Sequence, residues 1–225
     1  MRRLIVAASL FCGVGTACVS NDPAQPATRP YPIYKVNTPC EPSATREAQV
    51  HSIFRAPARY GTTWYPHSGR ISLRWTHVVI HHSATASGGA KTFDRYHRES
   101  NGWDELGYHF VIGNGTDTPD GYVEVGTRWH KQKHGAHCKT ESNYYNEHGI
   151  GICLVGNFNK TRPTQRQRAS LQRLARFLCR ECEIPPERVT THAAITRKTQ
   201  CPGRHFNPAA LRRSLATSAA ATSMP

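Results

Sequence analysis

Two histidine-bearing segments and one cysteine could together hold a metal ion. His81 and His82 are adjacent, His192 lies far along the chain, and Cys201 follows nine residues after His192. Zinc takes imidazole and thiolate ligands tetrahedrally, and three protein ligands leave a fourth position for water, as in catalytic zinc sites. Side chains alternate across a strand, so only one of the two adjacent histidines can easily reach a metal. Because the chain has 13 histidines, this spacing alone is a weak signal for zinc.

Short strands and helices alternate around these residues. Apolar and β-branched runs predict strands over residues 75–81, 107–113, 122–125, 149–156 and 188–190. Helical spacing of apolar residues predicts helices over 92–100, after Thr164 as far as Cys179, and over 208–215 with Asn207 as a cap. Two glycines inside the 149–156 strand indicate close backbone approach. We expect an α/β fold, a single domain with a mixed central β-sheet flanked by helices.

The N-terminus has the pattern of a secretory signal peptide. Arg2 and Arg3 precede a short apolar run, and small residues follow at positions 15–17. Cleavage after Ala17 would leave Cys18 first, as in a bacterial lipoprotein, although such signals prefer a larger aliphatic residue than Gly15. We therefore expect an exported protein, periplasmic or envelope-associated, and the pattern leaves open whether a lipid anchor is attached at Cys18.

The rest of the chain divides by composition. Prolines recur between residues 23 and 42, which is typical of an extended tether, and the last residues are rich in Ala, Ser and Thr. We expect a signal peptide over 1–17, a Pro-rich tether over 18–45, one domain over 46–215 and a flexible tail over 216–225. Nothing in the sequence requires a partner chain, so we expect a monomer.

The chain is strongly basic, with a formal net charge of +14. Such a surface attracts polyanions. Export favours the cell envelope as the partner, and the arginines spread along residues 162–180 suit a solvated helix face, so we expect no nucleic acid ligand. Export also permits disulfides, and we expect one or both of Cys179 and Cys182 to pair with Cys40 or Cys138.

Five motifs then occur in a recognisable order. They are Ile80–Thr85 (Ile-His-His-Ser-Ala-Thr), Gly102-Trp103 through Gly107-Tyr108-His109-Phe110, Gly135-Ala136-His137, Gly149–Phe158, and His192 with Cys201-Pro202-Gly203. In this order they resemble the zinc-dependent N-acetylmuramoyl-L-alanine amidases, a superfamily that includes phage lysozyme-type amidases and peptidoglycan recognition proteins. The resemblance covers residues from about 75 to 210. It implies that superfamily's fold, a Zn²⁺ cofactor, peptidoglycan or muropeptides as partner, and hydrolysis of the bond between N-acetylmuramic acid and L-alanine.

The resemblance also assigns roles to single residues. It implies His81, His192 and Cys201 as the zinc ligands. His82 is then expected to be a packed or hydrogen-bonded neighbour. Tyr108 matches a tyrosine that hydrogen-bonds the attacking water or the developing oxyanion, and His137 matches a position near the substrate.

The chain departs from the family pattern at two places. Phage members carry a lysine two residues before the ligand cysteine and many animal recognition proteins a threonine, whereas this chain has Lys198-Thr199-Gln200-Cys201. Lys198 is the expected oxyanion stabiliser, because an ammonium stabilises an oxyanion better than a hydroxyl does, and Thr199 is the alternative. Some bacterial relatives place a glutamate where Cys153 stands. Cys153 is expected to be a buried core cysteine.

Two other functions fit the same fold. A recognition protein binds peptidoglycan without cutting it, and such proteins usually lack a zinc ligand, whereas all three occur in this chain. An amidase toxin directed at competitors' cell walls would have the same site, and the sequence does not separate it from the housekeeping enzyme.

Overall fold

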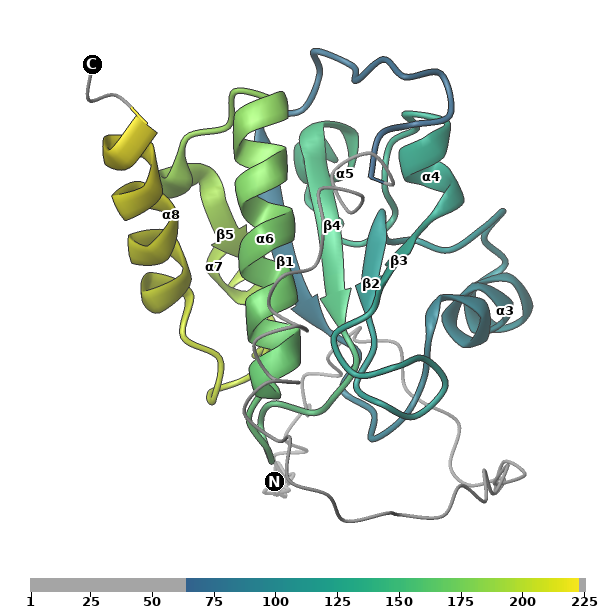
Figure 1. Ribbon diagram of the computed structural model, residues 1–225. Helices are drawn as coiled ribbons and strands as arrows, with labels where there is room; N and C mark the ends of the chain where they lie inside the picture. The colour runs from purple at the N-terminus through teal and green to yellow at the C-terminus, as the bar shows by residue number, and fades with distance from the viewer. Residues whose placement is uncertain (1–63, 223–225) are drawn as a thin grey trace, which may run out of the picture.

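Five short strands form one mixed sheet in the computed structural model, which describes residues 64–222 (Figure 1). The strands are β1 (His77–His82), β2 (Phe110–Ile112), β3 (Val123–Val125), β4 (Gly149–Leu154) and β5 (Val189–Thr191). Their order across the sheet is β3-β2-β4-β1-β5. β4, β1, β5 and β2 run parallel, and β3 pairs antiparallel with β2. The mixed central sheet expected from the sequence is confirmed.

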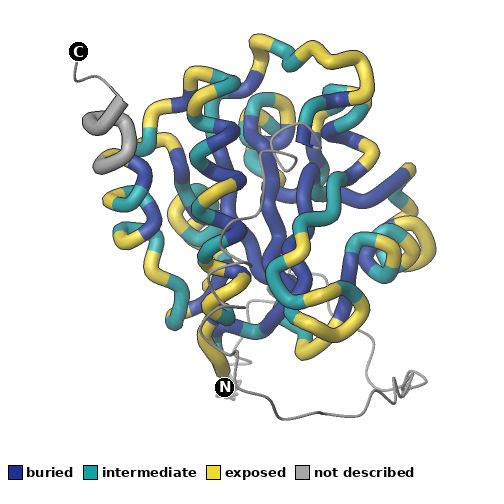
Figure 2. Tube along the Cα trace, in the orientation of Figure 1, coloured by how far each residue is buried: buried dark blue, intermediate teal, exposed yellow. Residues whose placement is uncertain are grey.

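The strands β1 and β4 are buried along almost their whole length, with side chains that alternate between the two faces of the sheet. In β1 and β4, Val78 lies beside Ile150 and Ile80 beside Ile152, and all four side chains are buried. A parallel strand covered on both sides needs such a continuous apolar run. Figure 2 shows these strands as the buried centre of the molecule.

The sheet carries six helices and one 3-10 turn within residues 64–222. They are α3 (Ala90–Asn101), α4 (Thr127–His130), α5 (Tyr144–His148), α6 (Gln165–Glu181), the turn η1 (Pro186–Arg188), α7 (His192–Thr196) and α8 (Pro208–Thr222). In Figure 1, α6 crosses one face of the sheet, α8 lies beside the β5 edge, and α3 lies beyond the opposite edge, which β3 forms. None of these helices has the length and hydrophobicity of a membrane span.

Helix α6 begins where the sequence predicts and is tied to the sheet. The Thr164 hydroxyl accepts a hydrogen bond from the Gln167 backbone N–H at 2.9 Å, and the Gln167 side chain accepts one from the Thr164 N–H at 3.1 Å. This capping box satisfies two otherwise unpaired backbone donors. The Gln167 amide also donates to the carbonyls of Ile112 and Val155. The helix start is therefore held against the carboxyl ends of β2 and β4.

Several short elements differ from the sequence prediction. Helices α4, α5 and α7 were not predicted, because a helix of four or five residues has no favourable local nucleus and depends on tertiary contacts. Helix α8 continues to Thr222, beyond the predicted end at Leu215. The added segment is rich in alanine, the strongest helix former.

The described cysteines are all free thiols. Cys138, Cys153, Cys179, Cys182 and Cys201 form no disulfide with one another, so the predicted pairing with Cys138 is wrong. Cys138 is fully buried, whereas Cys179 lies in α6 and Cys182 caps the end of that helix. Cys40, the predicted signal peptide and the predicted tether lie outside the described residues.

Candidate metal centre

The register of the sheet brings the first two predicted ligands together. β1 and β5 are parallel neighbours in which Ile80 lies beside Thr191. The residue that follows each member of this pair is a predicted ligand: His81 near the end of β1, and His192 at the start of α7. Cys201 joins them from the loop after α7. One ligand atom from each of the three side chains lies within 4.8 Å of the others.

The geometry of the triad fits zinc. His81 Nδ1 lies 3.6 Å from Cys201 Sγ. With zinc–nitrogen bonds of about 2.0 Å and zinc–sulfur bonds of about 2.3 Å, a tetrahedral site separates these two atoms by about 3.5 Å. His81 and Cys201 are buried and His192 is half-buried. The set offers two imidazoles and one thiolate, with one side reachable from solvent.

The cysteine loop is clamped so that its sulfur points inward. The Ala193 N–H donates to the Cys201 carbonyl at 2.7 Å, and the His82 N–H donates to Cys201 Sγ at 3.4 Å. Gly203 has a φ of +101°, and a Cβ there would lie 2.4 Å from the backbone carbon of Phe158. Only glycine suits both the conformation and the space. These contacts hold the loop against the end of β4.

His82 points away from the triad, as strand alternation requires. Its Nδ1 accepts a hydrogen bond from the Phe158 N–H at 3.1 Å. The ring therefore supports the segment after β4, and the expectation of a hydrogen-bonded neighbour is confirmed.

Tyr108 lies beside the triad just before β2. Its ring centre is 5.3 Å from that of His81 and 5.6 Å from that of His97, and its side chain is half-buried. Cys153 is fully buried beneath it, as expected. Burial raises the pKa of the Cys153 thiol, and a hydrogen bond with Tyr108 acts in the opposite direction.

His137 lies deeper in the site than the sequence suggested. Its side chain is buried, with 8% of the residue exposed. Its Nδ1 is 3.1 Å from His81 Nε2, and its Nε2 is 3.2 Å from the Gly149 carbonyl oxygen. Both ring nitrogens are thus engaged within the protein.

The imidazoles around the site are held neutral. Burial lowers the pKa of His81 and of His137 well below the usual range, and neighbouring histidines act in the same direction. Burial also lowers the pKa of His97 to about 4. Because a neutral imidazole keeps a lone pair, this environment favours metal binding over protonation.

Lys198 and Thr199 lie on the ligand loop, but their settings differ. Lys198 is exposed, and Thr199 is half-buried. The Thr199 hydroxyl accepts a hydrogen bond from the Cys201 N–H at 3.1 Å. Thr199 thus shapes the loop that carries the sulfur.

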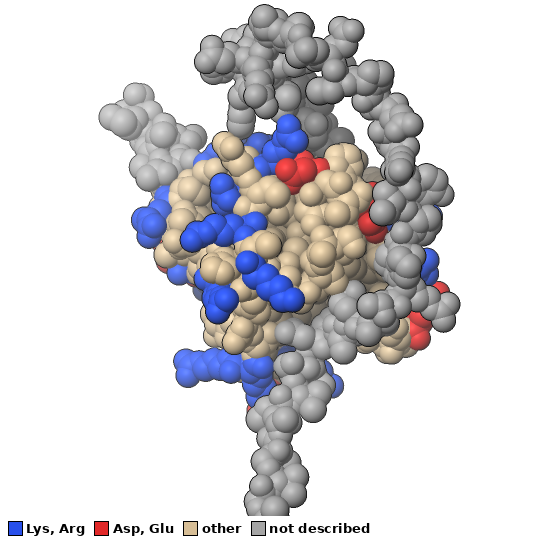
Figure 3. Space-filling model, turned by 90° about the horizontal axis from the view of Figure 1, so that it is seen from below, with Lys and Arg blue, Asp and Glu red and all other residues tan. Residues whose placement is uncertain are grey.

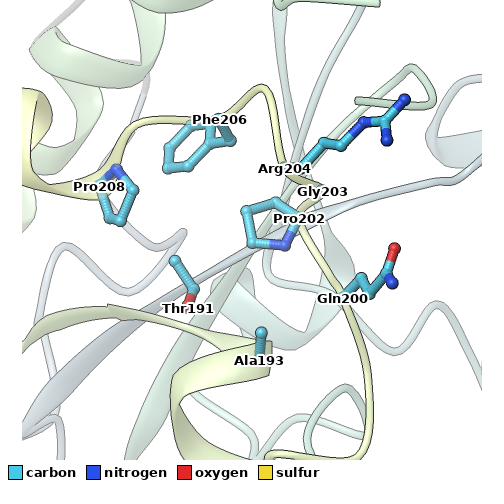
Figure 4. Close-up of a pocket in the computed structure, with 8 residues that line it drawn as sticks. All are labelled: Thr191, Ala193, Gln200, Pro202, Gly203, Arg204, Phe206 and Pro208. Atoms are coloured by element: carbon cyan, nitrogen blue, oxygen red, sulfur yellow. The ribbon is translucent and has the colours of Figure 1, made fainter. Parts of the chain in front are cut away.

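The ligand loop also lines a hollow, which Figure 4 shows with its lining residues. It has a volume of about 430 Å³, and its walls are mostly apolar. Its lining includes Ala193, which follows a predicted ligand, and Gln200 and Pro202, which flank another, but none of the three ligand residues themselves. This hollow is therefore separate from the metal centre.

The end of the sheet that carries the site is basic. Figure 3 views this end, and Lys and Arg side chains gather over one half of it while Asp and Glu are few there. Two loops that meet here carry exposed cations, Lys160 and Arg162 in one and Lys198 and Arg204 in the other. The loops are joined by a hydrogen bond of 3.0 Å from Arg204 Nε to the Asn159 carbonyl.

The family of the chain follows from comparison with known proteins. Residues 72–204 match the Amidase_2 family, described as N-acetylmuramoyl-L-alanine amidase. This chain belongs to that family. The match includes all three residues of the triad.

Individual relatives agree with this membership. The N-acetylmuramoyl-L-alanine amidase of Sus scrofa is 30% identical over 158 residues, which are 64% of this chain and 24% of the relative. Peptidoglycan-recognition protein SC1a of Drosophila melanogaster is 26% identical over 154 residues, which are 61% of this chain and 77% of the relative. The chain thus spans about a quarter of the length of the mammalian amidases that it matches.

Solved structures show the same fold. The N-acetylmuramoyl-L-alanine amidase LysC from Clostridium intestinale URNW matches with a TM-score of 0.52 and 26% identity, over 68% of this chain and 92% of that chain. The ectodomain complex of peptidoglycan recognition proteins LCa and LCx, with tracheal cytotoxin bound, matches with a TM-score of 0.50 and 29% identity, over 60% of this chain and 80% of that chain. The family fold expected from the motifs is confirmed.

Two residues of the site's surroundings were not singled out from the sequence. His97, on α3, accepts a hydrogen bond from the Gly107 N–H and contacts Tyr108. Asn146 accepts from the N–H groups of His137 and Cys138. Neither has a local sequence signal, because each partner is a backbone group of another segment.

Proposed function

We propose that the protein is a zinc-dependent amidase that hydrolyses the bond between N-acetylmuramic acid and L-alanine in peptidoglycan or muropeptides. The observation that carries this proposal is the triad of His81, His192 and Cys201 in a family whose members include amidases. A recognition protein that only binds has no use for three ligand atoms gathered within 4.8 Å. Family membership alone does not separate the two functions, but a complete ligand set favours hydrolysis.

The three ligand side chains would hold the ion from three different segments. Zinc bound by three protein ligands acts as a Lewis acid and supplies activated water near neutral pH. Burial lowers the pKa of His81 well below its usual range, so this ring would present a lone pair, and the backbone N–H of His82 would stabilise the sulfur of Cys201 as a thiolate. His81 and Cys201 are buried, and His192 is the half-buried member of the triad through which solvent and substrate would reach the ion.

Tyr108 and Lys198 would act on the substrate rather than on the metal. Attack of water on the lactyl carbonyl places negative charge on the former carbonyl oxygen. The Tyr108 ring lies 5.3 Å from that of His81, so its hydroxyl would be one donor, and Lys198 offers an ammonium from the ligand loop. Donors directed at such an oxyanion contribute about 100-fold or more to the rate.

The basic end of the molecule fits an envelope partner. No salt bridge within residues 64–222 involves Lys160, Arg162, Lys198 or Arg204, so these cations are available to attract an anionic wall or membrane. We infer an exported protein that works in the periplasm or at the envelope, and the sequence leaves open whether Cys18 carries a lipid anchor. Fractionation of a bacterial host that expresses the full chain should place the protein in the periplasm or envelope. Membrane association that Cys18→Ser abolishes would show the anchor.

Hydrolysis is tested on purified peptidoglycan with mass spectrometry of the released products. Untreated protein should release stem peptides with a free N-terminal L-alanine, a chelator should stop the release, and added zinc should restore it. His81→Ala should release none, whereas His134→Ala, which changes an exposed histidine outside the triad, should match the original protein. Zinc-loaded protein that binds the wall and releases nothing would show that recognition alone is the function.

The roles of Lys198 and Thr199 are distinguished by a matched pair of single variants. Lys198→Ala should lower kcat by about 100-fold and leave zinc affinity unchanged, because it removes only an oxyanion donor. Thr199→Ala should change zinc affinity as well, because its hydroxyl positions the Cys201 N–H. A larger loss of kcat in Thr199→Ala at saturating zinc would reverse the assignment.

A further inference from the structure

We propose that His137 is a positioning residue that fixes the tautomer of His81, so that Nδ1 of His81 and not Nε2 faces the metal. The inference rests on the zinc site of the proposed function, but it does not depend on peptidoglycan as the substrate. It also gives His137 a role other than contact with substrate.

The first step is the location of one hydrogen on His137. The Gly149 carbonyl oxygen only accepts hydrogen bonds. His137 Nε2, at 3.2 Å from it, must therefore carry the hydrogen. A neutral imidazole has one N–H, so His137 Nδ1 has a lone pair and accepts.

The second step passes this constraint to the ligand. His81 Nε2 lies 3.1 Å from His137 Nδ1. Because His137 Nδ1 accepts, His81 Nε2 must donate and so carries the only hydrogen of its ring. His81 Nδ1 is left with its lone pair, and this is the atom 3.6 Å from Cys201 Sγ. A backbone carbonyl in β4 thus decides, through one intervening ring, which nitrogen of His81 is free for a metal.

The protein builds a space for the His137 ring. A Cβ added at Gly151 would lie 2.4 Å from His137 Cδ2, and one added at Gly135 would lie equally close to the same atom. The Asn146 side chain accepts a hydrogen bond of 2.8 Å from the His137 N–H. Two glycines, one amide and one carbonyl therefore confine this ring, which contacts a ligand from behind. A hydrogen bond to the ring nitrogen that does not bind the metal orients metal-bound histidines in general.

The decisive measurement is the tautomer of His81 in the zinc-free protein. Long-range ¹H–¹⁵N correlation spectra distinguish a protonated from an unprotonated ring nitrogen. We expect His81 to carry its hydrogen on Nε2 before any metal is added, and to become a mixture of tautomers in His137→Leu. A His81 ring protonated on Nδ1 in the original protein would overturn the proposal.

Zinc affinity gives a second readout, measured by competition with a chromophoric chelator. His137→Leu removes the acceptor and should weaken zinc binding by about 10- to 100-fold. In His137→Asn the side-chain oxygen takes the place of Nδ1, so we expect recovery to within a few-fold of the original affinity. Equal affinities for His137→Leu and the original protein would contradict the proposal.

A third variant displaces the His137 ring through a substitution at a neighbouring residue. Gly151→Ala leaves His137 in the chain but fills the space of its ring, so it should weaken zinc binding as His137→Leu does. His134→Asn changes an exposed histidine in the same loop and should have no effect on affinity. Thermal unfolding of the zinc-free variants shows whether each is folded, and the tautomer of His81 is read only in folded protein.

The outcomes separate this inference from the proposed function. If the original protein binds no zinc, the proposed function fails, while the zinc-free spectrum still reports on the bond between His81 and His137. If zinc binds and peptidoglycan is cleaved but His81 binds through Nε2, this inference alone is wrong.

Discussion

Two buried polar clusters in residues 64–222 are built on opposite principles. The candidate metal centre gathers His81, His192 and Cys201, with one ligand atom of each within 4.8 Å of the others. The second cluster is centred on Arg128, which is only 2% exposed. Its guanidinium donates to the carbonyls of Leu106 and His134 at 2.7 and 2.8 Å, and to a carboxylate oxygen of Asp104 at 2.5 Å.

The second cluster satisfies itself, whereas the first is complete only with a ligand. Around Arg128, one carboxylate oxygen of Glu105 accepts hydrogen bonds from Thr127 and Lys131. The other has no hydrogen-bond partner within the described part of the chain but lies 3.3 Å from the Lys133 ammonium, so the charges of this cluster are paired within the chain. In the candidate metal centre, two imidazoles and a sulfur come together. The Arg128 cluster flanks this site, because Leu106 precedes Tyr108 and His134 precedes His137. Under the proposed function, one cluster would provide chemistry and the other rigidity.

The largest effect should come from removing a ligand atom. Cys201→Ser, or removal of zinc by a chelator, should lower amidase activity to below about 1% of the original, because the Lewis acid is lost. The fold should remain, since the serine side chain fills nearly the same space as the cysteine that it replaces. Peptide release and thermal unfolding of the zinc-free protein measure the two effects. Activity above a tenth of the original in Cys201→Ser would mean that the sulfur is not a ligand.

The second effect should fall on stability rather than on chemistry. Arg128→Met leaves buried carbonyls without their donor and should lower the free energy of unfolding by about 3 kcal/mol. Arg98→Met, which breaks the exposed pair with Asp94, should change it by less than about 0.5 kcal/mol. Urea denaturation measures both. A loss in Arg128→Met no larger than that in Arg98→Met would remove the distinction between the clusters.

Tyr108→Phe should affect the chemistry alone. The ring is kept and the hydroxyl is lost, so we expect kcat to fall by about 100-fold, with zinc affinity and stability close to those of the original. Tyr122→Phe, at an exposed tyrosine, is the control and should leave kcat unchanged. A fall in zinc affinity in Tyr108→Phe would instead make this residue part of the support for the ligands.

The smallest effect should be a dependence of stability on pH. Burial lowers the pKa of both His97 and His109 to about 4 in the folded protein, and their unfolded value is near 6.5. Between these values the unfolded chain binds more protons, so stability falls as pH decreases from 6.5 towards 4. At pH 5.5 the loss is roughly 1 kcal/mol for each histidine, relative to pH 8. Urea denaturation over this range checks the sign, and constant stability would contradict it.

The core elements could be predicted because their patterns are local. The apolar run that forms β1, the strand over residues 122–125 and the start of α6 after Thr164 lie at or near the predicted places. The strand glycines were also interpreted correctly: Gly149 approaches the Tyr145 backbone and Gly151 approaches the His137 ring. The short helices were missed because their stability comes from neighbours distant in sequence.

The sequence by itself determined the type of fold, the family and the identity of the candidate ligands, because apolar periodicity, caps and ordered motifs are properties of neighbouring residues. Only the tertiary structure decided how the ligands meet. The pairing of Ile80 with Thr191 brings two histidines into register, and the Gly149 carbonyl orders the hydrogens of His137 and His81. Such contacts join residues far apart in the chain, and hydrogen-bond direction depends on their relative placement, which no local pattern encodes.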